Sequence, residues 1–362
     1  MSLFSQSSVS LTPAPLTPAP LAPAPLAQGT HHTPGSGVSG DGDLSASVIA
    51  RLADATIADP YRQQWNIWHT QRVEELTAPH GYLAPVSITW LGEGDTVRVP
   101  RIPGVWHAQG DTLYYVPASA DAAQSTSPDD AAVTLAGEPI TAVIGFRPRL
   151  FGEEALGYFD YGELRVEINS QTDIAARDRH RFWIRVKDPH AQARAEFPGI
   201  PTYPVDPAWR IPARFRRAQP GELDIHDSVV RTVLQSYPTV GTVEFDHGGA
   251  HHSLVVCNVF GHVTVFFSDE TSGRQTYAIG RVLHLDPLHL DDLDHIDFNY
   301  ALNYPCAFSR FCTCPIPSKR NHLPFAVTAG EKTPFSAADY AVTPAGTPDE
   351  ASQDGAPQEA LQ

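Results

Sequence analysis

Several functional classes are disfavoured by what this chain of 362 residues lacks. Lysine occurs only at Lys187, Lys319 and Lys332, and 41 acidic residues against 25 basic ones give a formal charge of −16. A field of this sign repels nucleic-acid phosphates and anionic lipid headgroups, so the sequence predicts neither a nucleic-acid nor a membrane partner. No apolar run approaches the ~18 residues of a transmembrane helix. Motifs for dinucleotides, phosphate loops, serine nucleophiles and zinc proteases are also absent.

Cysteine is scarce as well. The chain has four, and Cys306, Cys312 and Cys314 lie within nine residues of one another. So few thiols in so long a chain do not form a disulfide framework, and they suit a reducing compartment. The first ten residues contain neither the basic nor the apolar segment of a secretory signal. The sequence therefore predicts a cytoplasmic protein.

Proline, in contrast, is abundant and divides the chain. Residues 11–26 read LTPAPLTPAPLAPAPL, a pattern that favours an extended polyproline II segment, and a stretch rich in Gly and Ser follows it. We therefore predict a disordered tail and linker over residues 1–46. A second disordered tail is predicted over residues 336–362.

One helix is predicted at the start of the folded part. Asp59 and Pro60 are typical of a helix start. Behind them, spacings of four and three residues place five side chains on one face: Tyr61, Trp65, Trp68, Arg72 and Leu76. This largely aromatic face predicts an amphipathic helix that packs against the rest of the fold.

Beyond the helix, the hydrophobic pattern has the two-residue period of β-strands. It recurs on both sides of a proline-rich break at 197–215, in segments 81–91, 112–116, 163–169, 181–188, 241–245, 253–260, 262–269 and 281–286. Turn residues rather than helical segments separate these strands, which favours hairpins. We predict a mainly β fold of two antiparallel β-modules, sandwich-like or barrel-like. The first covers residues 47–197 together with the helix, and the second covers residues 198–335.

Five segments carry a family likeness: GYLAPVSITWLGEG (81–94), RHRFWIRVKD (179–188), FPGIPTYPVDPAWRI (197–211), FSDETSGRQTYAIGRVL (267–283) and IDFNYALNYPCAFSRFCTCPIPSKRNHLPFAVTAGEK (296–332). Over about residues 61–333 the chain resembles an uncharacterised bacterial and archaeal family, domain of unknown function 1684. The last segment contains the family's D-F-N-x-A, P-C-A, T-C-P-x-P, N-x-L-P and A-G-E elements. It departs from the family pattern at Tyr304 and Ser318, where the family usually has proline. It also departs at Cys312, where the family usually has a residue other than cysteine. The resemblance implies no particular reaction.

The clustered cysteines allow several interpretations. A zinc site of Cys306, Cys312 and Cys314 with His295 or His322 lacks the paired C-x₂₋₄-C spacing of structural sites. In an extended chain, alternate side chains lie about 6.6 Å apart, too far for a disulfide between the last two thiols. A Cys306–Cys314 disulfide switch and a cysteine nucleophile stay possible, although no histidine belongs to the family pattern. We favour buried packing of small thiols, and we predict no metal and no cofactor.

The polar residues of the same region are the candidate site. Carboxylates are buried only when they are paired, and Arg281 is the obvious partner for Asp297, Asp269 or Glu331. We predict Asp297 and Glu331 as acid or base, and seven ligand-binding residues: Arg281, Asp269, Asn299, Asn303, Asn321, Tyr277 and Cys306. The predicted function is to bind a small polar molecule of unknown identity in a water-accessible pocket, with acid–base catalysis as an extension.

The alternative is a non-catalytic interaction module. In that interpretation the proline-rich tail at 11–26 recruits a partner, and the polar residues only cap turns. The sequence indicates no particular oligomeric state.

Overall fold

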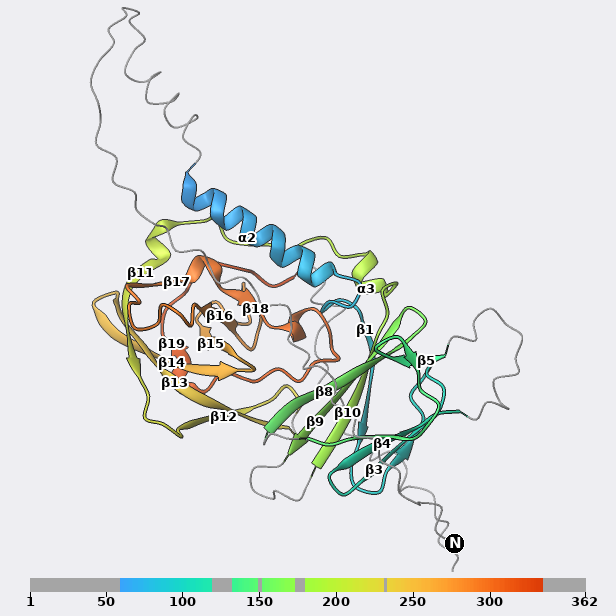
Figure 1. Ribbon diagram of the computed structural model, residues 1–362. Coiled ribbons are helices and arrows are strands. Elements are labelled where there is room, and N and C mark those ends of the chain that lie inside the picture. Colours follow the sequence, from blue (N-terminus) through green and yellow to red (C-terminus); the bar gives the residue numbers. More distant parts are fainter. Residues whose placement is uncertain (1–58, 119–131, 149–151, 173–179, 231–232, 335–362) are drawn as a thin grey trace, which may run out of the picture.

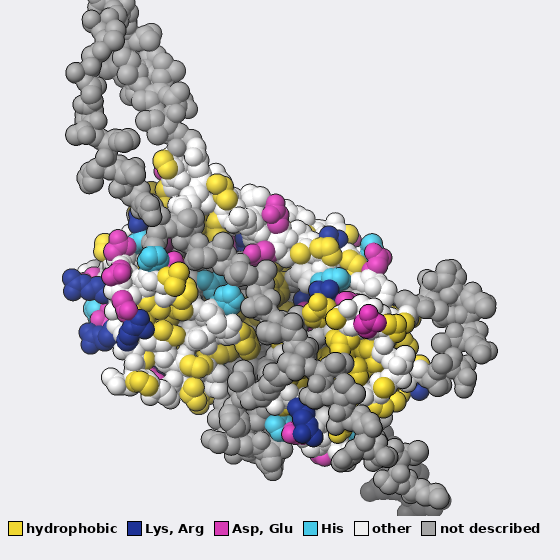
Figure 2. All heavy atoms as spheres, in the orientation of Figure 1, with side chains coloured by type: hydrophobic (Ala, Val, Ile, Leu, Met, Phe, Trp, Pro, Cys, Tyr) yellow, Lys and Arg dark blue, Asp and Glu magenta, His cyan; other side chains and the backbone are white. Residues whose placement is uncertain are grey.

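The computed structural model describes residues 59–118, 132–148, 152–172, 180–230 and 233–334. The two predicted tails, 1–46 and 336–362, lie outside the described residues. Among the helices of the described part, none is long and apolar enough to cross a membrane. In the space-filling view, acidic and basic side chains are mixed at the outer end of the C-terminal sheet rather than forming a surface of one sign (Figure 2).

The predicted helix is α2 (Pro60–Thr77). Asp59 caps it, because its side chain accepts a hydrogen bond from the backbone N–H of Tyr61 at 3.1 Å, and Pro60 occupies the first turn. Four of the five positions predicted from the spacing are the buried residues of the helix, namely Trp65, Trp68, Arg72 and Leu76, and the fifth, Tyr61, is half-buried. The helix lies along one side of the C-terminal sheet (Figure 1). It is anchored there by the indole N–H of Trp65, which donates to the backbone oxygen of Asn299 at 2.8 Å.

Two antiparallel sheets form the first half of the fold. The six-stranded sheet has the order β1 (Pro85–Leu91), β10 (His180–Lys187), β9 (Leu164–Thr172), β8 (Gly152–Tyr161), β5 (Val133–Leu135) and β6 (Glu138–Pro139). The four-stranded sheet has the order β2 (Thr96–Val97), β3 (Val105–Gln109), β4 (Thr112–Val116) and β7 (Ile144–Phe146). Their facing sides share one core around Trp106 and Phe159, whose rings lie 5.5 Å apart.

A nine-stranded sheet forms the second half. Its order is β17 (His295–Asp297), β11 (Arg210–Arg217), β13 (Leu234–His247), β14 (Ala250–Val259), β15 (His262–Asp269), β16 (Arg281–Leu285) and β18 (Leu302–Asn303). Two further strands lie off this path: β12 (Leu223–Asp227) pairs with β13, and β19 (His322–Leu323) pairs in parallel with β15. The turn between β13 and β14 uses Gly248 and Gly249, both with positive φ, as a two-residue hairpin of this kind requires.

Short segments complete the described part. They are α3 (Gln192–Ala195) and the 3₁₀ turns η2 (Pro207–Trp209), η3 (Phe298–Tyr300), η4 (Pro305–Ala307) and η5 (Lys319–Asn321). The predicted class, a mainly β fold of antiparallel sheets behind one main helix, is confirmed. The strands divide between 187 and 210, which agrees with the proline-rich break, while the proposed domain limits remain predictions.

Candidate functional site

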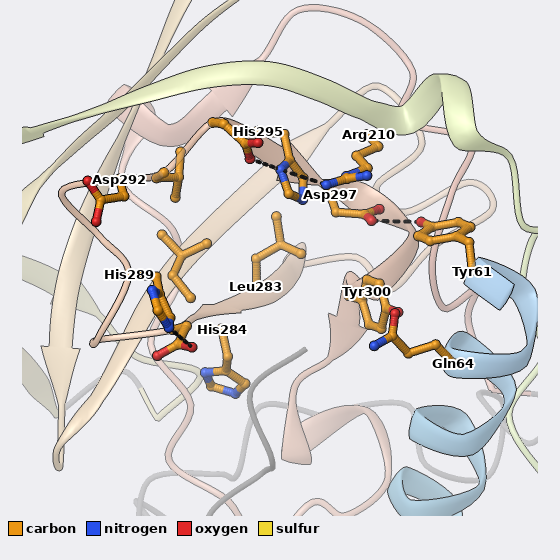
Figure 3. A pocket seen from close by; sticks show the side chains of 14 residues that line it. Tyr61, Gln64, Arg210, Leu283, His284, His289, Asp292, His295, Asp297 and Tyr300 are labelled. Atoms are coloured by element: carbon orange, nitrogen blue, oxygen red, sulfur yellow. Dashed lines mark hydrogen bonds and ion pairs between the residues drawn. The ribbon is translucent and has the colours of Figure 1, made fainter. Parts of the chain in front are cut away.

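A pocket of about 250 Å³ opens between the first turns of α2 and the chain that connects β16 to η3. We call it the acidic pocket. Its lining residues are Tyr61, Gln64, Arg210, Leu283, His284, Leu285, Asp286, His289, Asp292, Leu293, Asp294, His295, Asp297 and Tyr300. Tyr61, Gln64 and Tyr300 lie on one side of Leu283, and His284 and His289 lie on the other (Figure 3). Four aspartates and one arginine line it, so its charge is negative when the histidines are neutral.

Asp297 is held firmly at the edge of this pocket. It ends β17 and caps η3, so its Oδ1 accepts the backbone N–H of Asn299 at 3.0 Å. The hydroxyl of Tyr61 donates to Asp297 Oδ2 at 2.7 Å (Figure 3). Burial and the adjacent carboxylate raise the pKa of Tyr61 far above its ordinary value, so this hydroxyl keeps its proton. The half-buried carboxylate of Asp297 is therefore held in one orientation. The start of η3 binds one of its oxygens, and the first turn of α2 binds the other.

Asn299 supports the same corner from behind. Its side-chain amide donates to the hydroxyl of Tyr61 at 2.9 Å and to the backbone oxygen of Asp206 at 2.8 Å. The neighbouring residue, Tyr300, faces the pocket, and burial followed by the effect of Asp297 raises the pKa of Tyr300 to about 12. Both phenols at this corner consequently act as neutral donors at physiological pH.

Arg210, His295 and Asp294 continue the rim beside Asp297, since Arg210 on β11 is the strand partner of Asp297 on β17. His295 lies within hydrogen-bond reach of Asp294, and a guanidinium nitrogen of Arg210 lies 3.2 Å from Nδ1 of His295 (Figure 3). The hydrogen bond from His295 lowers the pKa of Asp294, which therefore stays ionised. Asp292, in contrast, is exposed and has no hydrogen-bond or ion-pair partner among the described residues. Its carboxylate is available to a ligand.

His284 forms the floor next to Leu283. Its Nδ1 lies 3.2 Å from the hydroxyl of Thr264. Burial, and to a lesser extent the neighbouring His262, lower the pKa of His284 to about 3, so the imidazole is uncharged at neutral pH. The pocket thus combines ionised carboxylates with neutral hydrogen-bonding groups.

Three of the predicted site residues, Asp269, Arg281 and Glu331, lie elsewhere. Together with Arg72 they form what we call the buried arginine network. The guanidinium of Arg281 donates to Asp269 Oδ2 and to the backbone oxygen of Val327, each at 2.8 Å. It also donates to the backbone oxygen of Ala329. Arg281, Asp269 and Glu331 are at most 2% exposed.

Glu331 joins the second arginine of this network to the sheet. Its Oε1 accepts from Arg72 Nε at 3.2 Å, and its Oε2 accepts the backbone N–H of Asn303 at 2.6 Å. Asn303 is the strand partner of Arg281 in the β16–β18 pair, and its side chain donates to the backbone oxygen of Lys332 at 2.8 Å. Helix, sheet and C-terminal segment therefore meet at these charges.

The remaining predicted residues make backbone contacts. Asn321 uses its whole side-chain amide, since it accepts from the N–H of Val255 at 2.7 Å and donates to the backbone oxygens of Val255 and Phe266 at 2.9 and 2.7 Å. Tyr277 donates to the backbone oxygen of Cys306 at 3.0 Å. Burial is the largest reason why the pKa of Cys314 lies well above its ordinary value, so this thiol is a poor nucleophile.

The structure therefore differs from the expected single hollow. It brings Arg281, Asp269, Glu331 and Asn303 together, but without access to water, and of the predicted residues it places Asp297 at a separate, open pocket, with the buried Asn299 behind it. The reason is that backbone oxygens of residues 327–331 surround the Arg281 guanidinium and leave no room for a ligand.

Arg210 and most of the aspartates and histidines of the pocket were missed by the sequence reasoning. The available signal was the segment HLDPLHLDDLDHID (284–297), in which five aspartates and three histidines occur within fourteen residues. A concentration of this kind, directly after a strand, indicates a polar segment that is open to solvent in part.

Comparisons with known proteins place the second half of the chain in a sequence family. A family model described as "Protein of unknown function (DUF1684)" matches residues 195–332. A search of curated proteins gave no significant match. Among solved structures, the chain is similar to an uncharacterized protein of Haloarcula marismortui, determined by solution NMR, with 31% identity and a TM-score of 0.32. The similarity covers 39% of this chain and 79% of that one.

Proposed function

The chain belongs to the family described as protein of unknown function DUF1684, and from that premise we propose that it binds a small, positively charged polar ligand in the acidic pocket. The observation that carries the proposal is the lining: four aspartates and one arginine surround a volume of about 250 Å³. Ligand pockets of this composition select by charge, because a cation gains and an anion loses free energy in a field of negative sign. The volume lies just below the ~300 Å³ lower end for drug-sized ligands, which favours a small metabolite.

Asp297 is the contact that we place at the centre of the proposal. Tyr61 and Asn299 hold its carboxylate in one orientation, so little conformational entropy is lost when a ligand pairs with it. An ammonium or guanidinium group would form charge-assisted hydrogen bonds with it, while the uncharged His284 and Tyr300 would contact hydroxyl or amide groups of the same ligand.

Catalysis is a further step within the same proposal. Asp297 is the predicted acid or base that borders the pocket, so it is the residue able to exchange a proton with a bound ligand. Glu331 and Arg281 take a supporting role, because their charges are already paired with Arg72 and Asp269. Asn303, Asn321, Tyr277 and Cys306 take part in hydrogen bonds to the backbone outside the pocket, so we give them a structural role.

A thermal-shift screen tests ligand binding. We would compare small amines and guanidinium compounds with carboxylic acids of matched size. The proposal expects stabilisation by members of the cationic set alone, and loss of that stabilisation in Asp297→Asn. Asp291→Asn is the matched control, because Asp291 lies in the same segment but pairs with Arg217 outside the pocket. Equal stabilisation by anions, or an unchanged response of Asp297→Asn, contradicts the proposal.

Deletion of residues 1–46 separates this function from the interaction-module alternative. If the pocket is the functional site, the truncated chain keeps the full thermal shift with its best cation. If the tail carries the function, the deletion abolishes binding of the partner, whereas Asp297→Asn leaves that binding unchanged.

A further inference from the structure

A second group of side chains that can bind a ligand lies away from the acidic pocket. Asp224 and His226 are two residues apart on β12, so they share its buried face, and Cys257 reaches them from β14, on the other side of β13. The three residues are 6%, 1% and 1% exposed. Their ligand atoms, one from each side chain, all lie within 4.8 Å of one another. No residue of this group lines the acidic pocket.

The orientation of His226 is decisive. Its Nδ1 lies 3.1 Å from the backbone oxygen of Ile316. A carbonyl oxygen only accepts, so Nδ1 carries a proton, and Nε2 is the ring nitrogen that faces the carboxylate of Asp224. Nε2 lies 3.2 Å from Asp224 Oδ2, yet it has no partner of hydrogen-bond geometry among the described residues. A buried nitrogen and a buried carboxylate oxygen at this separation need a positive charge between them, either a second ring proton or a bound metal ion.

The distances fit such a cation. Tetrahedral zinc binds histidine nitrogen and carboxylate oxygen at about 2.0–2.2 Å and thiolate sulfur at about 2.3 Å, which places neighbouring ligand atoms roughly 3.3–3.6 Å apart. The separation of 3.2 Å between His226 Nε2 and Asp224 Oδ2 and that of 3.8 Å between Cys257 Sγ and Asp224 Oδ2 are close to these values. A backbone carbonyl behind the remote ring nitrogen is also the usual support of a metal-bound histidine.

We propose that Asp224, His226 and Cys257 form a binding site for a divalent transition-metal ion, with zinc as the preferred ion. One thiolate, one imidazole and one carboxylate make a donor set of borderline softness, which suits zinc better than magnesium or calcium. The ion replaces the thiol proton, which leaves to solvent. It joins β12 to β14 across β13 and stands beneath the segment around Ile316. Three protein ligands leave one position of the tetrahedron for water.

Cobalt(II) titration of the full-length chain tests the proposal. The protein is purified without a polyhistidine tag, stripped with a chelator and titrated with Co²⁺ alone. We expect one equivalent to bind, with visible bands typical of a tetrahedral site and a near-ultraviolet charge-transfer band from a thiolate, both removed by one equivalent of Zn²⁺. Zinc is also expected to raise the thermal midpoint of the stripped protein, since it binds only the folded chain.

Variants assign the ligands. Cys257→Ser is expected to lose the charge-transfer band, and Asp224→Asn and His226→Gln to weaken cobalt binding by more than about tenfold. Cys312→Ser is the control, because Cys312 is also buried in the same core but lies outside the group, and this variant should keep the band. A wild-type protein without the band, or a band that survives Cys257→Ser, overturns the proposal and leaves a simple Asp224–His226 ion pair.

X-ray absorption covers the case in which a variant does not fold. The zinc-loaded wild type is expected to show one sulfur at about 2.3 Å and the remaining ligands, nitrogen or oxygen, at about 2.0–2.2 Å. A shell without sulfur, or with two or three sulfurs, contradicts the proposal, since the latter would indicate the cysteines of the 306–314 cluster instead.

Discussion

Arg281 is the clearest example of a charge whose role is set by its surroundings. Its guanidinium is fully buried, pairs with Asp269 at 2.8 Å and lies 5.4 Å from the ring centre of Phe267. A buried ion pair gains little over a well-packed apolar pair, because desolvation offsets the attraction, but removal of one partner leaves an uncompensated charge. Such a residue is retained because it fixes how the 327–331 segment lies on β16, rather than because it meets a ligand.

Arg281→Met is therefore expected to lower the free energy of unfolding by about 3–5 kcal/mol, the loss typical of a broken buried pair. Urea denaturation measures this loss. The double variant Arg281→Met/Asp269→Asn should lose less than the sum of the single variants, since it removes both charges. Arg216→Met is the control: its exposed pair with Glu244 should contribute almost nothing. A loss as small as that of the control shows that the buried pair does not hold the segment.

Gly330, in the A-G-E element, explains a second part of the family pattern. It has φ of +76°, and a Cβ atom at this position would lie 2.4 Å from the backbone oxygen of Ala301. Gly249 has nearly the same φ, +79°, but open space around it. The two glycines therefore separate conformational strain from steric contact.

Gly330→Ala and Gly249→Ala are expected to differ in stability. Gly249→Ala should cost about 1–2 kcal/mol, the strain of a left-handed alanine. Gly330→Ala should cost clearly more, because the backbone of Ala301 cannot move aside without shifting Glu331, whose N–H donates to it at 2.8 Å. Chemical denaturation of both variants provides the comparison. Equal losses contradict the steric explanation.

At the scale of elements, a cluster of three charged residues joins two strands of the first half. Glu167 on β9 accepts from Lys187 at 2.6 Å and from Arg185 at 3.1 Å, both on β10. Burial alone would raise the pKa of Glu167, but Lys187 and Arg185 outweigh it and hold this pKa below its ordinary value of 4.5. The unfolded chain therefore takes up the proton first as the pH falls. The stabilisation by Glu167 is complete above about pH 4.5 and is lost as the pH drops through the folded-state pKa.

Glu167→Gln is accordingly expected to be less stable than the wild type at neutral pH and to show a shallower loss of stability below about pH 4.5. Denaturation midpoints over a pH series measure both effects. Glu163→Gln is the control on the neighbouring turn, because its carboxylate is 75% exposed and pairs only with the exposed His190. Parallel pH profiles for the Glu167 variant and the wild type contradict the assignment.

The elements themselves were largely predictable, because their signals are local. The cap at Asp59 and the three- and four-residue spacing defined α2, and alternation defined the long strands. What alternation missed is the second face of β10. Alternation in RFWIRVKD (181–188) puts Trp183 on the same side as Arg181 and Arg185, yet Trp183 is fully buried against Trp90, with ring centres 5.0 Å apart. Arg185, on that same side, donates to the backbone oxygen of Phe311 at 2.7 Å. Segments 126 residues apart cover this face, and no local pattern reports such a contact.

At the scale of the whole molecule, the same limit applies to the site. The polar residues of the 296–332 segment could be singled out from the sequence, but their division into a closed network and an open pocket could not. That division depends on α2, which covers Glu331 through Arg72 and leaves Asp297 beside Tyr61 at its first turn. The two contacts lie about three turns apart along one helix, so the helix position decides which carboxylate meets water.

A small third core connects the two halves of the fold. It combines Leu76 at the end of α2, Leu83 before β1, Ile200 in the proline-rich break, and Ala307 and Phe308 near the clustered cysteines. Each of the two larger cores, in contrast, belongs mainly to one half. The third core is therefore one place at which the stability of one half is transmitted to the other.

Phe308 is the central side chain of this junction. It is 1% exposed, its ring contacts that of Phe197 at 6.1 Å between centres, and the guanidinium of Arg72 lies 5.7 Å from its centre. Phe308→Ala should cost about 3–5 kcal/mol, as for other buried aromatic side chains. Because the lost contacts join the two halves, the substitution should reduce the cooperativity of unfolding. We expect one calorimetric transition in the wild type and two separated transitions in the variant.

Phe159→Ala is the matched control, since Phe159 is equally buried but lies wholly within the core of the first half. The expected cost per side chain is the same, about 3–5 kcal/mol. With the junction intact, this variant should unfold in one transition at a lower temperature, because the weakened half remains coupled to the other. A single lowered transition for both variants shows that the halves are coupled elsewhere, through contacts such as that of Arg185 with the 306–314 cluster.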